Sequence, residues 1–210
     1  MSDLNEIEKI LDENKKKYSK RKQTNDAEQP AAPVSSSVER KYYLDSIDVK
    51  VVRTADDVVM PKYAHDGDAC VDLRAYDVLE VIDANGNVRK IDNFEDVTLY
   101  KGYIVKFRTG LKFDLPDGWS GDILIRSGIS SNEGLVLMNG KGEVDTTYNG
   151  EIIVAIGKIN NFPTTIRKND RIAQFKPMRQ TYMNLTEVDS FEEDIDNQRG
   201  EAGLGSSGRN

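Results

Sequence analysis

From residue 42 onward, apolar and polar residues alternate with a period of two, which is the pattern of strands that bury one face. Turn residues separate these segments, and Asn85-Gly86 between two of them is the strongest short signal for a β-hairpin. After residue 40 no segment predicts a helix longer than a few turns. Many short strands with turns between them predict an all-β barrel or sandwich. The predicted strands are Val49–Arg53, Val71–Tyr76, Val78–Ile82, Val88–Ile91, Tyr103–Thr109, Leu111–Leu115, Asp122–Ile125 and Arg171–Pro177.

Two further apolar runs, Gly134–Met138 and Ile152–Ile156, flank a polar block at Gly142–Glu151. This layout predicts two strands joined by a tight connection, with the side chains near its tip lining a concave surface. Within the block, Asp145 and Tyr148 lie three residues apart. A carboxylate can take a proton from water and a ring can stack on a sugar-like ligand, so the pair is a candidate site. By itself the block fits an ordinary hairpin with a polar tip equally well.

The chain divides by composition into a polar extension at 1–40, a β-rich core at 41–188 and a C-terminal arm at 189–210. In the extension, apolar residues at helical spacing predict a short helix, and a basic run follows it. Residues 23–38 are rich in Pro, Ala and Ser, as linkers are. We interpret the extension as a solvated tail. The alternatives are a helix within residues 1–24 that binds a protein partner, or a weak nucleic-acid contact through the basic run.

Composition narrows the class of protein. The net charge of −7 argues against a protein that coats nucleic acid, so we expect no stable nucleic-acid complex. No apolar run approaches the ~20 residues that cross a bilayer, and the N-terminus has no signal-peptide pattern. The single cysteine, Cys70, excludes an intramolecular disulfide, and these features together predict a cytoplasmic protein. An anionic protein that binds an anionic ligand needs a local cationic pocket or a metal.

Three segments carry polar groups suited to such a site. Arg126-Ser127-Gly128 combines a guanidinium fork, a hydroxyl and a backbone amide, which suit an anion, although a turn with an exposed arginine has the same pattern. Arg199–Gly208 contains four glycines and two serines able to approach phosphate oxygens, although a disordered tail is the commoner meaning of that composition. In Gly67–Leu73, Asp72 lies on the strand face opposite its apolar neighbours, toward a polar cleft or on the surface.

In chain order these segments resemble the five motifs of the trimeric dUTPase family, over roughly residues 45–208. Any one motif is a weak signal, whereas five in order at plausible spacing are a strong one. The matching segments are Gly67–Leu73 with Arg74-Ala75, Arg126-Ser127-Gly128, Gly142–Glu151, Asp170-Arg171-Ile172-Ala173-Gln174 and Arg199–Gly208.

The resemblance implies a jelly-roll-like β-barrel that assembles as a homotrimer, with active sites at the subunit interfaces. It implies hydrolysis of dUTP to dUMP and pyrophosphate with Mg²⁺ as cofactor, an activity that limits uracil in DNA and supplies dUMP for thymidylate synthesis. In this family the C-terminal motif crosses from one subunit and closes over the nucleotide bound at another. Residues 189–210 would then be a C-terminal arm and glycine-rich lid.

The resemblance also implies a role for each matching residue. Asp145 matches the general base that activates the water attacking the α-phosphorus, and Tyr148 matches the ring that packs on the deoxyribose and rejects ribonucleotides. Asp72 matches the carboxylate that holds Mg²⁺ through water. The other matches bind substrate: Arg126, Ser127 and Gly128 at phosphate, Asn139, Gly142, Glu143 and Val144 at uracil, Gln174 near the α-phosphate, and Arg199, Leu204, Gly205, Ser206 and Ser207 in the lid.

Residues 78–101 are longer than in compact members of the family, with the hairpin around Asn85-Gly86 as the inserted element. The insertion and residues 1–24 are the candidate contact sites for a protein partner. Such extra elements are consistent with a phage or viral member, whose enzyme would act in the host cytoplasm.

Two other functions on the same fold stay open. The first is dCTP deaminase, which needs a glutamate where this chain has Ala155. The second is a non-enzymatic, nucleotide-sensing regulatory protein. The intact Asp145, Asp72 and Tyr148 argue against loss of catalysis in this chain.

Leu204 stands where the family usually carries an aromatic ring that stacks on uracil. Loss of a stacking ring weakens lid closure by about 1 kcal/mol, so we expect an active enzyme with a less tightly held lid. Leu204→Phe should therefore bind a non-hydrolysable dUTP analogue about fivefold more tightly, as measured by calorimetric titration. An unchanged affinity would contradict this interpretation of the lid.

Overall fold

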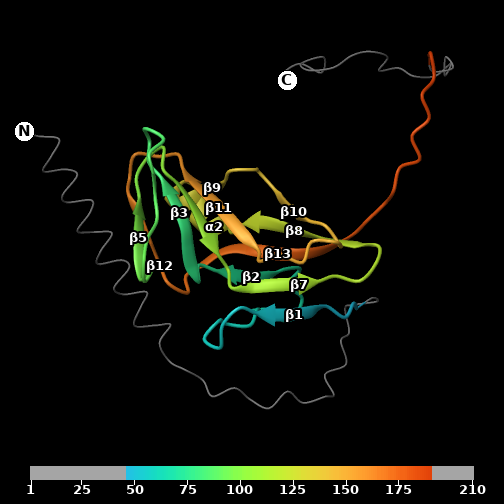
Figure 1. Cartoon of the computed structure of the whole chain (residues 1–210), viewed down its shortest axis with the longest axis horizontal. Helices are drawn as coiled ribbons and strands as arrows, with labels where there is room; N and C mark the ends of the chain where they lie inside the picture. Colours follow the sequence, from blue (N-terminus) through green and yellow to red (C-terminus); the bar gives the residue numbers. More distant parts are fainter. Residues whose placement is uncertain (1–45, 191–210) are drawn as a thin grey trace, which may run out of the picture. The chain divides into compact units, whose positions relative to one another are not determined.

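The computed structural model describes residues 46–190, where thirteen strands and one seven-residue helix, α2 (Ser127–Glu133), are present (Figure 1). Within this range no helix is long and apolar enough to cross a membrane. The architecture is all-β apart from the short helix, as the period-two pattern predicted. The strands are β1 (Lys50–Arg53), β2 (Val71–Arg74), β3 (Asp77–Ile82), β4 (Val88–Arg89), β5 (Asp96–Leu99), β6 (Ile104–Arg108), β7 (Leu111–Asp114), β8 (Trp119–Ile125), β9 (Leu135–Leu137), β10 (Gly142–Val144), β11 (Ile153–Lys158), β12 (Thr164–Arg167) and β13 (Arg171–Arg179).

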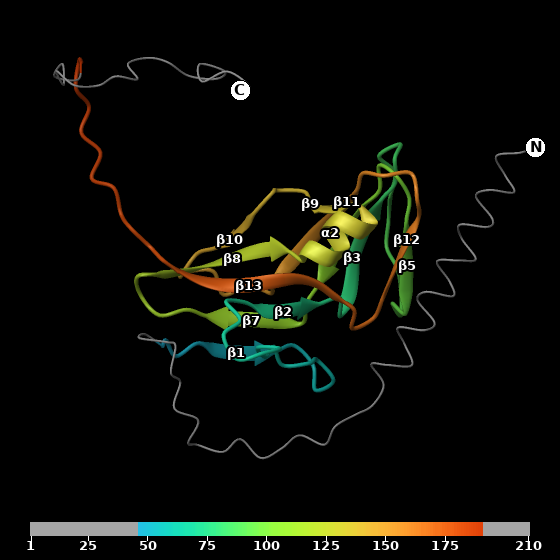
Figure 2. The same ribbon diagram turned by 180° about the vertical axis from the view of Figure 1, so that it is seen from behind.

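The strands form two larger sheets and two ribbons, and every pairing is antiparallel. The four-stranded sheet has the order β10-β8-β13-β2, and the five-stranded sheet has the order β4-β3-β6-β11-β9. The ribbons pair β1 with β7 and β5 with β12. Seen from behind, α2 lies beside β9 (Figure 2). Neighbours such as β8 and β13 are distant in sequence, so the chain crosses between sheets repeatedly, as jelly-roll folds do.

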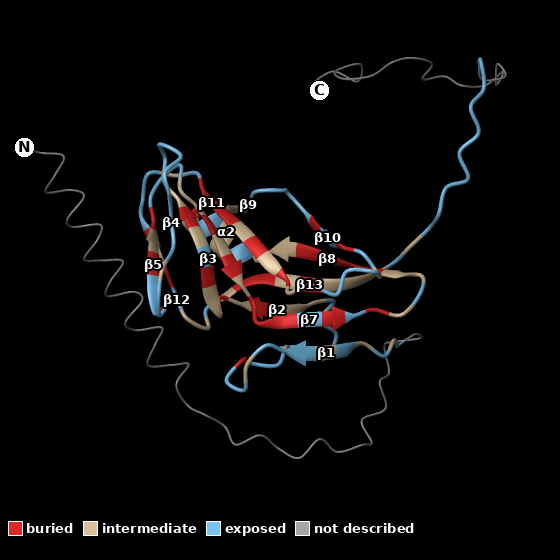
Figure 3. Cartoon of the chain, in the orientation of Figure 1, coloured by how far each residue is buried: buried red, intermediate tan, exposed pale blue. Residues whose placement is uncertain are grey.

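Both sheets and both ribbons contribute to one hydrophobic core (Figure 3). Alternate residues point into this core: on β6, Val105 and Phe107 are fully buried, whereas Lys106 between them is not. In the same core, Phe113 of β7 stacks on Phe175 of β13, with ring centroids 4.5 Å apart. The shared core holds β8 and its neighbours, which carry the candidate site, in a fixed arrangement.

The strands predicted from periodicity are present, with ends that shift by up to three residues. The hairpin at Asn85-Gly86 is confirmed, because β3 pairs with β4 and Gly86 has a φ of 85°. The Asp83 carboxylate accepts hydrogen bonds from the amides of Asn85 and Asn87 and closes the turn. The predicted strands did not include β5, β10 and β12, and helix α2 was not predicted either.

The predicted tight connection between Gly134–Met138 and Ile152–Ile156 is wrong. The two segments do pair, as β9 and β11, with Leu137 opposite Ile156. Between them, however, the chain leaves this sheet and forms β10, which pairs with β8 in the four-stranded sheet. Three residues carry no periodicity signal, and the strand exists because β8 offers it a partner. The connection is therefore a crossing between sheets.

Gly121 of β8 is required by packing, because a Cβ atom there would lie 2.1 Å from Cζ of Phe175. The ring is buried and stacked on Phe113, so it cannot move away freely. We expect Gly121→Ala to lower the free energy of unfolding by about 1–3 kcal/mol, as measured by chemical denaturation. Gly128→Ala is the matched control, since nothing lies within 4 Å of its Cβ position and its stability should be unchanged. Equal stability of the two variants would show that the core rearranges to accommodate a methyl group at Gly121.

Candidate active site

The predicted site residues lie in two clusters at opposite ends of β8. Arg126 directly follows the strand, whereas Asp145 follows β10, whose Val144 is paired with Gly121 near the start of β8. By this register Asp145 is opposite Ser120, six positions from Arg126, a separation of roughly 20 Å at ~3.3 Å per residue. One chain therefore presents a cationic cluster and an acidic turn as separate features.

The cationic cluster forms where β2, β13 and the end of β8 meet. The Asp72 side chain, 13% exposed, lies between two guanidinium groups. Nε of Arg126 is 3.0 Å from one carboxylate oxygen, and Nη1 of Arg171 donates to the other at 3.0 Å. Arg126 also donates to the backbone carbonyl of Arg171 at 3.3 Å, which ties the end of β8 to the start of β13. Asp72 thus holds two arginines from different strands side by side.

The cluster carries more positive charge than Asp72 neutralises. Burial lowers the pKa of Arg74, and the charge of the nearby Arg171 lowers it further. Three guanidinium groups near two carboxylates, Asp72 and Asp170, leave a local surplus of positive charge in a protein whose net charge is −7. Asp72 Oδ1 and Arg126 Nε are 3.0 Å apart but are not aligned for a hydrogen bond, and neither has a partner for one within the described residues. The two atoms are buried and face each other as an ion pair, and the other guanidinium donors of the cluster suit a polyanion.

Gln174, Ser127 and Gly128 lie beside the cationic cluster. Gln174 of β13 is the register partner of Asp72 on one side and of Leu124 on the other. Ser127 and Gly128 form the first turn of α2, and nothing lies within 4 Å of the Cβ position of Gly128. This open space allows a ligand to approach the backbone closely.

The acidic turn follows β10 and carries Asp145 and Tyr148. The Tyr148 amide donates to the Asp145 carbonyl at 3.0 Å, and both side chains are exposed. Thr146 fastens the turn to the sheet, because its hydroxyl contacts the carbonyl of Trp119 and the side-chain oxygen of Gln180. The Asp145 carboxylate therefore projects into solvent from a turn anchored at the start of β8.

The residues after Tyr148 hold its ring in place. The Tyr148 hydroxyl donates to the carbonyl of Glu151 at 2.9 Å, and a Cβ at Gly150 would lie 2.4 Å from that hydroxyl oxygen. The Glu151 carboxylate binds Arg108 at 2.7 Å and the amide of Gly110 at 2.8 Å. The hydrogen bond and the charge of Glu151 raise the pKa of Arg108. The Tyr-x-Gly-Glu spacing thus has a packing explanation, because the glycine leaves room for the ring and the glutamate fastens the turn to the β6–β7 corner.

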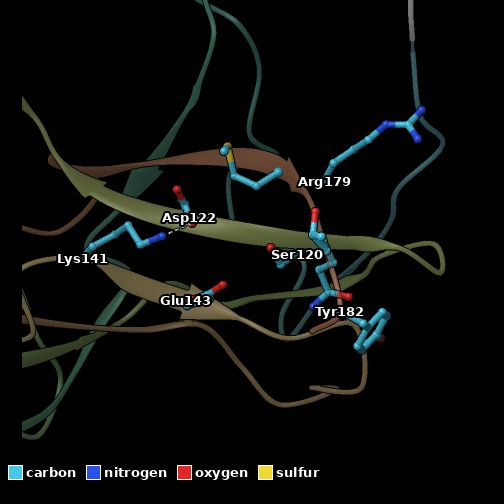
Figure 4. Close-up of a pocket in the computed structure, with 9 residues that line it drawn as sticks. Ser120, Asp122, Lys141, Glu143, Arg179 and Tyr182 are labelled. Atoms are coloured by element: carbon cyan, nitrogen blue, oxygen red, sulfur yellow. Dashed lines mark hydrogen bonds and ion pairs between the residues drawn. The ribbon is translucent and has the colours of Figure 1, made fainter. Parts of the chain in front are cut away.

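A cavity of about 300 Å³ lies on the outer face of β10, β8 and β13, next to the acidic turn (Figure 4). Glu143 lines it together with its cross-strand partner Asp122, which is buried. Lys141 binds Asp122 at 2.9 Å, and this hydrogen bond raises the pKa of Lys141. Lys141 thereby ties the loop before β10, which carries Asn139, to the middle of β8.

The remaining predicted residues are placed as follows. The amide nitrogen of Asn139 lies 3.3 Å from the Cβ position of Gly142, and Val144 is buried in the core. In the part of the chain that the structure describes, no group of three or more His, Cys, Asp or Glu side chains could hold a metal ion. The predicted lid residues Arg199, Leu204, Gly205, Ser206 and Ser207 lie outside the described residues.

Sequence reasoning overlooked residues that hold the predicted ones in place. Arg171 lies in the fourth motif without an assigned role, yet it shares Asp72 with Arg126. Its position three residues before Gln174 was the available signal. Arg108 is 43 residues away from its partner Glu151, and nothing in the local sequence links the two.

A family model for dUTPase matches residues 90–208, more than half of the chain. The chain belongs to the dUTPase family. The deoxyuridine 5'-triphosphate nucleotidohydrolase of Mycobacterium leprae (strain Br4923) is 39% identical over 166 residues, which cover 78% of this chain and 96% of the relative. The enzyme of the same name from Corynebacterium efficiens is 34% identical over 186 residues, which cover 84% and 91%.

Solved dUTPase structures share the fold. A mutant dUTPase of Staphylococcus bacteriophage 80alpha, solved with dUpNHpp, aligns with a TM-score of 0.62 at 22% identity, covering 78% of this chain and 100% of that chain. A mutant dUTPase of phage phi11 of S. aureus, whose structure concerns the coordination of a structural Mg(II) ion, aligns with a TM-score of 0.54 at 20% identity, covering 69% and 99%. The jelly-roll-like fold expected from the motifs is thus the dUTPase fold.

Proposed function

We propose that this member of the dUTPase family hydrolyses dUTP to dUMP and pyrophosphate in sites that combine the two clusters from different subunits. The observation that carries this proposal is the separation of Asp145 from Arg126 by roughly 20 Å along β8. The α-phosphorus has to lie within reach of the base and of the neutralising charges at once, and one chain cannot achieve this. A symmetric assembly brings the acidic turn of one copy to the cationic cluster of another, and the family supports a homotrimer.

Asp145 acts as the general base. Its carboxylate is exposed on a turn that Thr146 anchors, so it can take a proton from a water molecule in line with the α-phosphorus. As that water oxygen bonds to phosphorus, the bond to the bridging oxygen breaks and pyrophosphate leaves with the electron pair. Tyr148, held by Gly150 and Glu151, packs on the deoxyribose and leaves no room for a 2′-hydroxyl.

The strand β10 reads the base. It is an edge strand, so the donors and acceptors on its outer side have no partner strand and can pair with uracil. Gly142, Glu143 and Val144 supply these main-chain groups, and Asn139 lies over Gly142 at the end of the loop. A methyl group at position 5 of the base would clash with this loop, which excludes thymine.

The cationic cluster binds the triphosphate. Arg126 and Arg171 offer guanidinium groups already held side by side by Asp72, and Ser127 and Gly128 add a hydroxyl and backbone amides. Gln174, which is in register with Asp72, contacts the α-phosphate region. Phosphoryl transfer depends mainly on positioning and charge neutralisation, and this cluster supplies both.

Mg²⁺ fits this site as a companion of the substrate. Asp72 supplies a carboxylate at the cluster, and a carboxylate suits contact with Mg²⁺ through a water of hydration. The nearby guanidinium groups of Arg74, Arg126 and Arg171 disfavour a bare divalent cation, so we infer that the ion arrives on the triphosphate. When bound there, Mg²⁺ neutralises charge on the phosphate oxygens.

The outer segments complete the proposal. Tyr182, Met183 and Leu185, after the last strand, are 82%, 78% and 84% exposed, so residues 46–190 give this stretch no apolar cover, which supports an arm that docks on a second subunit. Residues 189–210 continue this arm into the lid, and residues 1–24 and 78–101 are the candidate contacts for a protein partner. The enzyme acts in the cytoplasm, where it limits uracil in DNA and supplies dUMP.

Replacing the general base should abolish turnover and leave the fold intact. We expect Asp145→Asn to lower kcat by about 10²- to 10⁴-fold in a pyrophosphate-release assay, because the water loses its proton acceptor. Thermal stability and affinity for dUpNHpp should be unchanged, since the side chain is exposed. Asp117→Asn, at an exposed aspartate in the β7–β8 turn, is the control and should retain wild-type activity. Turnover at the wild-type rate in Asp145→Asn would refute the assignment.

Two inactive variants should complement each other if the site is shared between subunits. Asp145→Asn and Arg126→Ala proteins, unfolded and refolded together in equal amounts, should form mixed trimers. In these, about a quarter of the sites combine an intact Asp145 with an intact Arg126 from another chain. Each variant refolded alone is the control. Mixed activity no higher than the sum of the two controls would mean that both residues act within one chain.

A further inference from the structure

Helix α2 carries Ser127 and Gly128, yet little apolar packing holds it. None of its residues is fully buried, and Ile129 is only partly buried against the core. Seven residues are too few for a helix that is stable by itself, so the position of α2 depends on the contacts at its two ends. At its first end, Arg126 is held by the Asp72 carboxylate.

At the other end, Lys158 of β11 holds the last carbonyl of the helix. Its ammonium group donates to the carbonyl of Glu133 and to the side-chain oxygen of Asn160. The Thr164 hydroxyl lies 3.5 Å from the same carbonyl. Gly134 ends the helix with a φ of 64°, and a Cβ there would lie 2.4 Å from the Asn160 amide nitrogen. The end of α2 is therefore seated closely against the β11–β12 connection.

A lysine is an unfavourable choice for this position on grounds of stability alone. Lys158 is 3% exposed, and burial lowers the pKa of its ammonium group. An apolar side chain of the same length would avoid the desolvation of a cation. The lysine does supply a donor to the Glu133 carbonyl, however, and a cation at the end of a helix is favoured by the helix dipole. Lys158 is therefore better suited to positioning the end of α2 than to packing in the core.

We propose that Lys158 is a positioning residue for the phosphate-binding segment Arg126-Ser127-Gly128 and acts through α2. The connection is a short series of hydrogen bonds. Lys158 binds the carbonyl of Glu133, which belongs to the same peptide unit as the Gly134 amide. That amide donates to the carbonyl of Ser130 at 3.0 Å. The amide of Ser130 in turn donates to the carbonyl of Arg126 at 3.0 Å. The Arg126 carbonyl and the Ser127 amide belong to the same peptide unit. A displacement at Glu133 is thus passed directly to the groups that face phosphate.

This inference rests on the proposed phosphate role of Arg126-Ser127-Gly128, and the test replaces Lys158 by methionine, which fills the space without a donor. We expect the Kd for dUpNHpp and the KM for dUTP to rise about tenfold, with a smaller change in kcat, because the phosphate contacts are displaced. Affinity for deoxyuridine, which lacks phosphates, should be unchanged, as followed by NMR titration. The melting temperature should stay within a few degrees of wild type, because loss of a buried cation is favourable while two acceptors lose their donor. Lys158→Gln, which keeps a shorter donor, should lie between Lys158→Met and wild type.

Lys106→Met is the matched control, because Lys106 lies on the neighbouring strand β6 and pairs with the Glu80 side chain, and it should keep wild-type affinity. Arg126→Ala separates the two proposals: if it leaves dUpNHpp affinity unchanged, the phosphate role itself fails. If Arg126→Ala weakens binding and Lys158→Met does not, the positioning role of Lys158 is refuted. If Lys158→Met and Lys158→Gln no longer fold, or lose deoxyuridine and dUpNHpp affinity in equal proportion, Lys158 is a structural residue and the proposal is overturned.

Discussion

The hydrogen-bonded register of β8 determines the geometry of the active site. The strand pairs with β13 along its whole length and with β10 over its middle, and a strand held on both sides cannot bend without breaking those bonds. It therefore keeps Arg126 and Asp145 roughly 20 Å apart. The packing of Phe175 over Gly121 fixes β8 on the core beneath this surface. A catalytic site built from both ends of such a strand needs more than one chain.

Positive and negative charge are also separated between the two ends of β8. The protein is anionic overall, yet around Asp72 three guanidinium groups produce a locally positive region. Charges on the surface are screened within about 10 Å at ordinary ionic strength, so the net charge of the whole chain does not cancel this local field. The acidic turn at the other end of β8 would repel the same phosphates if it lay beside them in the free chain.

The turns and loops that carry functional groups have to be held by rigid elements. In this fold single polar side chains form these connections. Thr146 fastens the acidic turn to a backbone carbonyl of β8, Lys141 fastens the base-reading loop to Asp122, and Lys158 fastens the end of α2. In each case one end of the contact belongs to a strand that the core immobilises. The apolar core therefore supplies stability, and a few hydrogen bonds transfer its rigidity to the functional groups.

The sequence by itself determined the strands and the chemistry of the individual motifs. Periodicity is a local property, so ten of the thirteen strands were predictable, and Asp145 and Tyr148 were placed on one turn by their spacing alone. The sequence did not determine β10, because three residues carry no period and the strand depends on its partner β8.

Only the tertiary structure decided which distant residues meet. Arg171 reaches Asp72 across 99 residues and Arg108 reaches Glu151 across 43, and contacts between segments so far apart leave no trace in local spacing. For the same reason, five motifs in a row indicate which groups are present but not which of them lie together. The structure places Asp145 and the paired arginines Arg126 and Arg171 at opposite ends of one strand, because antiparallel pairing with β10 reverses the direction of the chain between them.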